Sequence, residues 1–157
     1  MLLRRYQCNN FIFSEPLENR RKILAELDFS AETPKEVGES LHKEKQGFNI
    51  IIDCSGVPAA VEEALDWMAP LGKFLFFGIC PQNSQIKINP FQIFKKELTL
   101  IGSVINPFTF SRAIRLIEEI QLPLNSLGVK KYSLSEYQTA IEDVKSGRVM
   151  KGMFVVD

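Results

Sequence analysis

The chain has 157 residues, of which 45% are hydrophobic and 24% are charged, and its 19 basic residues balance 19 acidic ones. This length suits one domain with a buried core, and the zero formal charge argues against nucleic acid or an anionic membrane as a partner. No apolar run reaches the roughly 18 residues that a membrane-spanning helix needs.

Cysteine usage predicts the compartment. Cys8, Cys54 and Cys80 are odd in number and far apart, and no CxxC pair occurs. They are interpreted as buried thiols in a reducing, cytoplasmic environment. A metal site is the weaker alternative, because no second ligand lies nearby in sequence. The start of the chain becomes charged too early for a secretory signal.

The first elements are a helix end and a strand. Residues Met1–Gln7 have helical spacing but no N-cap, which predicts that the helix begins outside this chain. Phe11–Ser14 is the first complete strand, and Pro16 can open the next helix. Asp28–Thr33 reads as a loop or weak strand. Pro34–Gln46 reads as a charged surface helix.

The middle of the chain alternates strands with helices. Phe48–Cys54 carries three consecutive isoleucines, which predicts a strand buried on both faces, as in a parallel sheet. Further elements are expected, in chain order, at Val57–Ala69 (helix, stopped by Pro70), Lys73–Ile79 (strand), Pro90–Lys96 (short helix) and Glu97–Val104 (strand).

The last third is predicted to hold two helices and a strand. Ser111–Ile120 is the first helix, and the second begins near Leu134 with Ser135 as N-cap and ends at Gly147. Met153–Val156 is the final strand. The alternation along the whole chain predicts a doubly wound α/β fold with a parallel sheet.

Glu15 is the sharpest candidate for a function. An acid at the carboxyl end of a strand can accept both ribose hydroxyls of NAD and would repel the extra phosphate of NADP. Arg20 and Arg21 follow one helical turn later. Either could lie over the adenine or bind the ribose, or they could hold a 2′-phosphate. The alternative is a surface acid with two solvated arginines, just as the lone His42 reads as a solvated surface residue.

Three loops after later strands are expected to line the same crevice, because ligands bind outside the carboxyl ends of parallel strands. These loops are Asp53–Val57, Gly78–Pro81 and Gly102–Ile105. Their glycines alone are a weak signal. The sequence contains no GxGxxG, no cluster with metal-ligand spacing and no nucleophile elbow. It therefore offers no catalytic residue and no metal ligand.

Several motifs, in the right order along almost the whole chain, resemble the carboxyl-terminal half of a medium-chain dehydrogenase. They are Ser14-Glu15-Pro16 with Arg20-Arg21, Ile52-Asp53-Cys54-Ser55-Gly56, Phe77-Gly78, Lys96–Ser103 and Lys145-Ser146-Gly147. Within that family the chain is most similar to the zinc-dependent polyol, sorbitol and threonine dehydrogenases.

The resemblance implies an incomplete Rossmann-like sheet that lacks its first strand and its GxGxxG loop. That strand would lie between the Phe11 strand and the Ile50 strand. Residues 1–105 would form a partial dinucleotide-binding domain. Residues 106–157 would form a helix–helix–strand segment that returns to the catalytic domain, and the Met153 strand would lack sheet partners.

The resemblance also implies NAD-linked oxidation of a secondary alcohol such as a polyol, with zinc held by a catalytic domain that this chain does not contain. The chain alone is expected to be inactive. Glu15 would bind the adenosine ribose, Arg20 would assist it, and Lys151 would lie against the pyrophosphate. The full set of implied cofactor-binding residues is Glu15, Arg20, Ser55, Gly78, Ile79, Gly102, Ser103 and Lys151.

A different class of function stays open. The chain could be a non-catalytic NAD-binding or dimerisation module, with the Glu97–Val104 strand at a sheet edge that joins two copies. A methyltransferase-like sheet is a more distant alternative, because nothing in the sequence marks a methyl-donor site.

Overall fold

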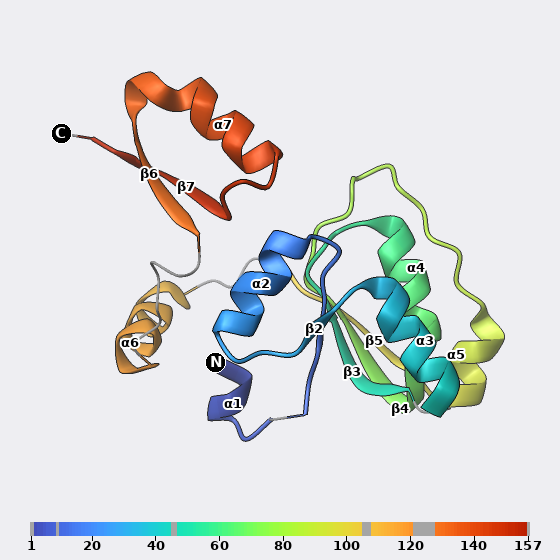
Figure 1. Ribbon diagram of the computed structural model, residues 1–157. Coiled ribbons are helices and arrows are strands. Elements are labelled where there is room, and N and C mark those ends of the chain that lie inside the picture. Colours follow the sequence, from blue (N-terminus) through green and yellow to red (C-terminus); the bar gives the residue numbers. More distant parts are fainter. Residues whose placement is uncertain (1, 9, 45–46, 105–107, 121–127, 157) are drawn as a thin grey trace. The chain divides into compact units, whose positions relative to one another are not determined.

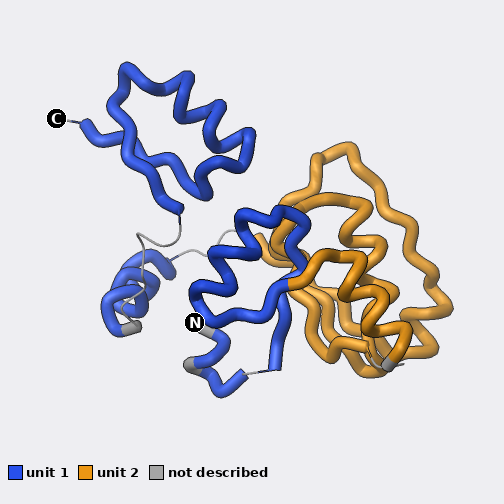
Figure 2. Tube along the Cα trace, in the orientation of Figure 1, with its two compact units in different colours: residues 1–31, 108–157 blue, residues 32–107 orange. Residues whose placement is uncertain are grey.

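The chain divides into two compact units, which Figure 2 shows in different colours. Unit 1 comprises residues 1–31 and 108–157, and unit 2 comprises residues 32–107. The structure is a computed structural model and describes residues 2–8, 10–44, 47–104, 108–120 and 128–156. Within these ranges, no helix is long and apolar enough to cross a membrane.

Unit 2 is built on a parallel three-stranded sheet (Figure 1). Its strands are β3 (Phe48–Asp53), β4 (Met68–Phe76) and β5 (Thr99–Gly102), in the order β3-β4-β5. Two helices make the crossovers, α4 (Pro58–Asp66) and α5 (Pro90–Lys96). The predicted alternation of strands and helices is confirmed, including a short helix at the predicted bounds of α5.

The core of unit 2 lies on one face of this sheet. Val61 and Leu65 of α4 pack with Met68 and Phe74 of β4, and both Val61 and Phe74 are 0% exposed. Helix α3 (Pro34–Glu44) buries Val37. It begins with a reciprocal cap that the sequence analysis did not predict. In this cap the Thr33 N–H donates to Glu36 Oε2 (2.8 Å) and the Glu36 N–H donates to Thr33 Oγ1 (3.2 Å).

The prediction that β3 is buried on both faces is wrong. Ile51 packs against the core, whereas the side chains of Ile50 and Ile52 are 64% and 42% exposed. Successive side chains of a strand point to opposite faces, and the buried cluster of unit 2 lies on the Ile51 face. An unbroken apolar run therefore does not show that both faces are covered within the same unit.

The predicted boundary between α4 and β4 is also displaced. Helix α4 ends at Asp66, and β4 begins at Met68 instead of Lys73. Phe48 pairs with Met68 but Ile50 pairs with Lys73, so β4 carries three extra residues at this point. This irregularity accommodates Pro70, which cannot donate a ladder hydrogen bond, and Leu71, whose φ is 62°.

The amino-terminal part of unit 1 contains helix α1 (Leu2–Arg5) and helix α2 (Glu18–Glu26). It also contains strand β1 (Phe13–Ser14), which pairs with β2 (Ala31–Glu32). The rings of Phe11, Phe13 and Phe29 pack with centroids 5.5–5.8 Å apart. In the described residues, β1-β2 and β3-β4-β5 are separate sheets, as expected for an incomplete doubly wound sheet.

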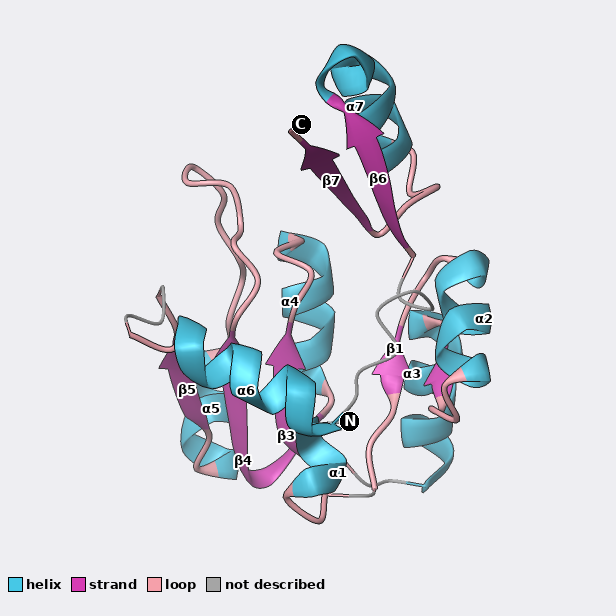
Figure 3. Cartoon of the chain, turned by 90° about the vertical axis from the view of Figure 1, so that its left-hand side faces the viewer, coloured by secondary structure: helices cyan, strands magenta, loops and turns pink. Residues whose placement is uncertain are grey.

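The carboxyl-terminal part of unit 1 corrects two predictions. Helix α6 (Phe110–Ile120) is followed by β6 (Val129–Ser133), the short helix η2 (Leu134–Glu136), α7 (Tyr137–Lys145) and β7 (Lys151–Val155). The segment is therefore helix–strand–helix–strand instead of helix–helix–strand. The final strand does not lack a partner, because β7 pairs in parallel with β6 along its whole length, from Val129↔Lys151 to Ser133↔Val155 (Figure 3).

The structure also tests three smaller expectations. The helical cap after β6 is Ser133 instead of Ser135, because Ser133 and Glu136 form a capping box. His42 is exposed, as predicted. The interpretation of the cysteines as buried thiols is wrong for Cys8 and Cys54, which are exposed, while Cys80 is half-buried. Cys54 directly follows β3, where the chain leaves the sheet.

Candidate functional site

Glu15 lies directly after β1, and its carboxylate is only 19% exposed. Oε1 accepts the N–H of Leu17 at 2.9 Å, and Oε2 lies 3.7 Å from Arg20 Nη1. Pro16 has no N–H, so Leu17 offers the first amide after Glu15, and α2 begins at Glu18 instead of Pro16. The structure therefore brings Glu15 and Arg20 together, with the acid near the positive end of a helix.

Arg20 and Arg21 have different environments; the spacing alone left both as candidates, and the resemblance implied Arg20. Arg21 Nη1 donates to the carbonyl oxygens of Glu15 and Pro16, at 2.7 Å each. Arg20 Nε is buried without a hydrogen-bond partner in the part of the chain that the structure describes. Arg20 is thus the arginine beside the carboxylate, and Arg21 is attached to the backbone.

In unit 2, Asp53 connects the loops that follow β3 and β4. Its Oδ1 accepts the N–H (2.9 Å) and the hydroxyl (2.6 Å) of Ser55, and its Oδ2 accepts the Gly56 N–H at 3.3 Å. Its carbonyl oxygen accepts the N–H groups of Phe77 (3.0 Å) and Gly78 (2.6 Å). Asp53 begins a loop that was expected to line the crevice, but no role of its own was predicted for it. An acid followed two residues later by serine and then glycine is a turn signal that points to this role.

Gly56 and Gly78 bring the same two loops into backbone contact. Gly56 has a φ of +63°, and a Cβ there would overlap the backbone of Ile79. A Cβ on Gly78 would overlap Gly56 N and would lie 2.8 Å from Asp53 Oδ2. The predicted residues Ser55, Gly78 and Ile79 are therefore adjacent, and the Ile79 side chain is 92% exposed.

Two further predicted residues lie at the end of β5. The Ser103 N–H donates to the Phe76 carbonyl at 3.2 Å, which places Gly102 and Ser103 beside the carboxyl end of β4. A Cβ on Gly102 would meet no atom within 4 Å. The structure thus gathers Ser55, Gly78, Ile79, Gly102 and Ser103 at the carboxyl edge of one sheet in unit 2. Lys151 is exposed at the start of β7, in unit 1.

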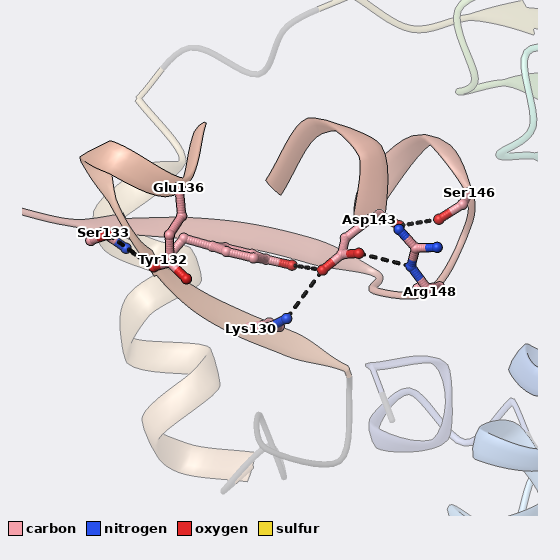
Figure 4. A network of polar contacts seen from close by, with 7 residues as sticks. All are labelled: Lys130, Tyr132, Ser133, Glu136, Asp143, Ser146 and Arg148. Carbon is pink, nitrogen blue, oxygen red and sulfur yellow. Dashed lines mark hydrogen bonds and ion pairs between the residues drawn. The ribbon is translucent and has the colours of Figure 1, made fainter. Parts of the chain in front are cut away.

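A polar network holds the β6–α7–β7 segment together (Figure 4). Asp143 of α7 is 7% exposed and accepts hydrogen bonds from Tyr132 Oη (2.7 Å), Arg148 Nε (2.7 Å) and Lys130 Nζ (3.1 Å). Hydrogen bonds from Tyr132, Arg148 and Lys130 lower the pKa of Asp143 to about 2. Burial and the bond to Asp143 raise the pKa of Tyr132. The sequence did not predict this network, because nothing distinguishes Asp143 from a surface acid.

This network predicts an acid-sensitive segment. The pKa of Asp143 falls from 3.8 to about 2 on folding, so its stabilising contribution is present above about pH 4 and is lost as the pH falls towards 2. We expect the hydrogen-exchange protection factors of the β6 and β7 amides, which correct for the intrinsic pH dependence of exchange, to fall over that range. Hydrogen bonds from Ser133 also lower the pKa of Glu136, so Asp143→Asn is the variant that isolates Asp143. Identical pH profiles for this variant and the wild type would contradict the prediction.

The described residues contain no group of three or more His, Cys, Asp and Glu side chains that could hold a metal ion. They therefore do not fit a catalytic zinc. Although Cys54 is exposed by surface area, partial desolvation of its thiol by the surrounding protein and the charge of Asp53 raise its pKa, which disfavours the thiolate that a metal would need. What the arrangement offers is a carboxylate beside an arginine, and a row of backbone groups at a sheet edge.

Comparisons with known proteins agree on one family. The family described as "Zinc-binding dehydrogenase" matches residues 1–119. D-arabinitol dehydrogenase 1 of Uromyces fabae is 24% identical over 105 residues, which are 67% of this chain and 30% of that protein. L-threonine 3-dehydrogenase of Pyrococcus horikoshii is 27% identical over 155 residues, which cover 92% of this chain and 44% of that protein. The chain thus spans less than half the length of these two curated relatives.

Solved structures share the fold. Benzyl alcohol dehydrogenase from Acinetobacter calcoaceticus superposes with a TM-score of 0.84 at 22% identity, over 99% of this chain and 46% of that one. A zinc-binding dehydrogenase from Sinorhizobium meliloti, bound to NADP, gives a TM-score of 0.77 at 26% identity, over 89% of this chain and 43% of that one. An alcohol dehydrogenase from E. coli in complex with NADH gives a TM-score of 0.79 at 20% identity, over 92% of this chain and 43% of that one.

Proposed function

This chain belongs to the zinc-binding dehydrogenase family, and we propose that it contributes the cofactor-binding part of an NAD-linked alcohol or polyol dehydrogenase. In this proposal residues 1–105 are a partial dinucleotide-binding domain, and residues 106–157 are a segment that returns to a catalytic domain. The names of the relatives, an arabinitol and a threonine dehydrogenase, support a secondary alcohol as the substrate class.

The observation that carries the proposal is the geometry at Glu15. One carboxylate oxygen is occupied by the Leu17 amide, while Oε2 is beyond hydrogen-bond distance of Arg20, at 3.7 Å. This oxygen is therefore available to accept ribose hydroxyls, and its negative charge opposes a 2′-phosphate. Similar structures hold NADH or NADP, so the fold does not decide between them. Glu15 is the feature of this chain that favours NAD.

The residues at the carboxyl edge of the unit 2 sheet have a binding role in this proposal. Backbone groups of Ser55, Gly78, Ile79, Gly102 and Ser103 would lie along the cofactor, since ligands of parallel sheets bind at this edge. Lys151 would place a positive charge against the pyrophosphate. The cofactor itself, when bound, accepts a hydride at its nicotinamide ring. The proposed role of this chain's residues is to bind and orient the cofactor.

We further propose that these 157 residues do not oxidise an alcohol by themselves. A zinc ion that polarises the alcohol oxygen needs three protein ligands or more, and the described residues offer no such group. Purified chain with NAD⁺ and sorbitol is therefore expected to form no NADH. Formation of NADH at 340 nm above a protein-free control would overturn this part of the proposal.

Isothermal titration with NAD⁺ and NADP⁺ tests the cofactor role. The chain is expected to bind NAD⁺ more tightly than NADP⁺. Glu15→Gln should weaken NAD⁺ binding about 10-fold, because a charge-assisted hydrogen bond contributes about 1.5–3 kcal/mol. Glu18→Gln is the matched control, since Glu18 is an exposed acid that pairs with Lys22 across one helical turn. The absence of NAD⁺ binding at millimolar concentration would refute the cofactor role.

A second candidate function is dimerisation, which one observation favours. Among the described residues β5 is the terminal strand of its sheet, so its outer edge offers backbone groups to which a second copy could bind. Phe91 and Phe94 of the preceding helix α5 add exposed apolar surface, at 60% and 79% exposure. We propose that the chain forms a homodimer through this edge. Sedimentation velocity of the samples used for titration separates the candidates, because a monomer that binds NAD⁺ supports the cofactor role alone.

A further inference from the structure

We infer that Arg21 is a positioning residue that sets the cofactor preference of Glu15. Arg21 lies in the first turn of α2, where its own N–H donates to the Leu17 carbonyl at 3.1 Å. Its side chain reaches back to the end of β1 and donates from Nη1 to the carbonyl oxygens of Glu15 and Pro16, at 2.7 Å each. The inference rests on the proposed function, in which Glu15 binds the adenosine ribose.

The two hydrogen bonds constrain the peptide groups on both sides of Pro16. One nitrogen bonds both carbonyl oxygens, so these oxygens must point towards the same atom. This constraint fixes the turn from which the Glu15 side chain projects. The carboxylate can then accept the Leu17 N–H with Oε1 at 2.9 Å and present Oε2 on the other side.

Arg21 also affects the local charge. Its guanidinium bonds neutral carbonyls and not the Glu15 carboxylate, which therefore faces one arginine, Arg20, at 3.7 Å. A second cation released beside Glu15 would offset its negative charge and would favour a 2′-phosphate. Attachment of Arg21 to the backbone thus orients the acid and directs the hydrogen bonds of the guanidinium to the carbonyl oxygens instead of the carboxylate.

The experiment compares Arg21→Gln, Arg21→Lys and the matched control Lys22→Gln in the full chain. Lys22 is 71% exposed and forms an ion pair with Glu18 across one turn of α2, so its replacement changes the charge of the helix without changing the turn before it. Two quantities are measured for each protein: the ratio of NAD⁺ to NADP⁺ affinity by isothermal titration, and the hydrogen-exchange rate of the Leu17 amide by NMR.

In Arg21→Gln the affinity ratio is expected to fall about 10-fold and the Leu17 amide to exchange at least about 10-fold faster, because the turn loses a charge-assisted contact. Arg21→Lys retains a donor and the charge, and should recover part of both quantities. Lys22→Gln should match the wild type. If the role of Arg21 were purely structural, Arg21→Gln would lower the affinities for NAD⁺ and NADP⁺ equally and leave their ratio unchanged.

The outcomes separate this inference from the proposed function. A wild type that prefers NAD⁺, with the same ratio in Arg21→Gln, overturns the inference and leaves the proposed function in place. A changed ratio with an unchanged Leu17 exchange rate overturns positioning as the cause. A wild type that binds neither dinucleotide overturns the proposed function, and the inferred preference with it. If Arg21→Gln does not fold, Arg21→Lys decides by the same two quantities.

Discussion

Gly78→Ala is expected to lower the free energy of unfolding of unit 2 by about 3 kcal/mol or more. The new methyl group would overlap Gly56 N and would lie 2.9 Å from the Cys54 carbonyl carbon. Both neighbours are backbone atoms, so no side-chain rotation can relieve the overlap. Urea denaturation followed by fluorescence measures the effect, since Trp67 is the single tryptophan of the chain and lies in unit 2.

Gly102→Ala is the matched control for this prediction. Gly102 lies at the same sheet edge, but a Cβ added there would meet no atom within 4 Å. The free energy of unfolding of this variant should therefore stay within about 0.5 kcal/mol of the wild-type value. Gly56→Ala provides a second destabilised variant, because Gly56 combines a φ of +63° with an overlap onto Ile79. Equal urea midpoints for the Gly78 and Gly102 variants would show that the two loops are not in contact.

Phe74→Ala is expected to lower the free energy of unfolding by about 3–5 kcal/mol, the range for removing a fully buried aromatic side chain. Phe74 is 0% exposed and belongs to the central strand β4, where it packs with Val61, Leu65 and Met68. Loss of its ring leaves a cavity between the sheet and α4. Because β4 pairs with both β3 and β5, the effect should reach the loops after all three strands.

Phe94→Ala is the control for the core prediction. The Phe94→Ala substitution removes the same atoms as Phe74→Ala, but Phe94 is 79% exposed. The free energy of unfolding should therefore stay within about 0.5 kcal/mol of the wild-type value. Denaturant midpoints of the two phenylalanine variants give the comparison. A similar loss in both variants would contradict the placement of the core on the Phe74 face of the sheet.

Much of the fold could be predicted because local patterns determine it. The three isoleucines of β3 identified a strand, and Asn89-Pro90 marks the start of α5, where the Asn89 side chain accepts the Phe91 N–H at 3.0 Å. Strand β6 was missed because two lysines and a serine surround its buried Tyr132, so no apolar run marks it. Its stability depends on Asp143, which is distant in sequence and which no local pattern reveals.

The candidate site could be predicted only in part, for a related reason. Arg20 lies in the first turn of the helix that begins shortly after Glu15, so their proximity could be anticipated from the sequence. The attachment of Arg21 to two carbonyl oxygens, and the use of Asp53 by two loops, depend on side chains that bond backbone groups. Such contacts leave no periodic signal, and the structure was needed to reveal them.

The contact between the loops after β3 and β4 has a mechanical consequence. Gly56 and Gly78 touch through their backbones, and Asp53 bonds both loops at once, through its carboxylate and its carbonyl oxygen. These contacts couple the two loops, so a displacement of one is expected to be transmitted to the other. A substitution that moves Ser55 is therefore expected to displace Ile79 as well, so a redesign of this edge needs paired changes in both loops.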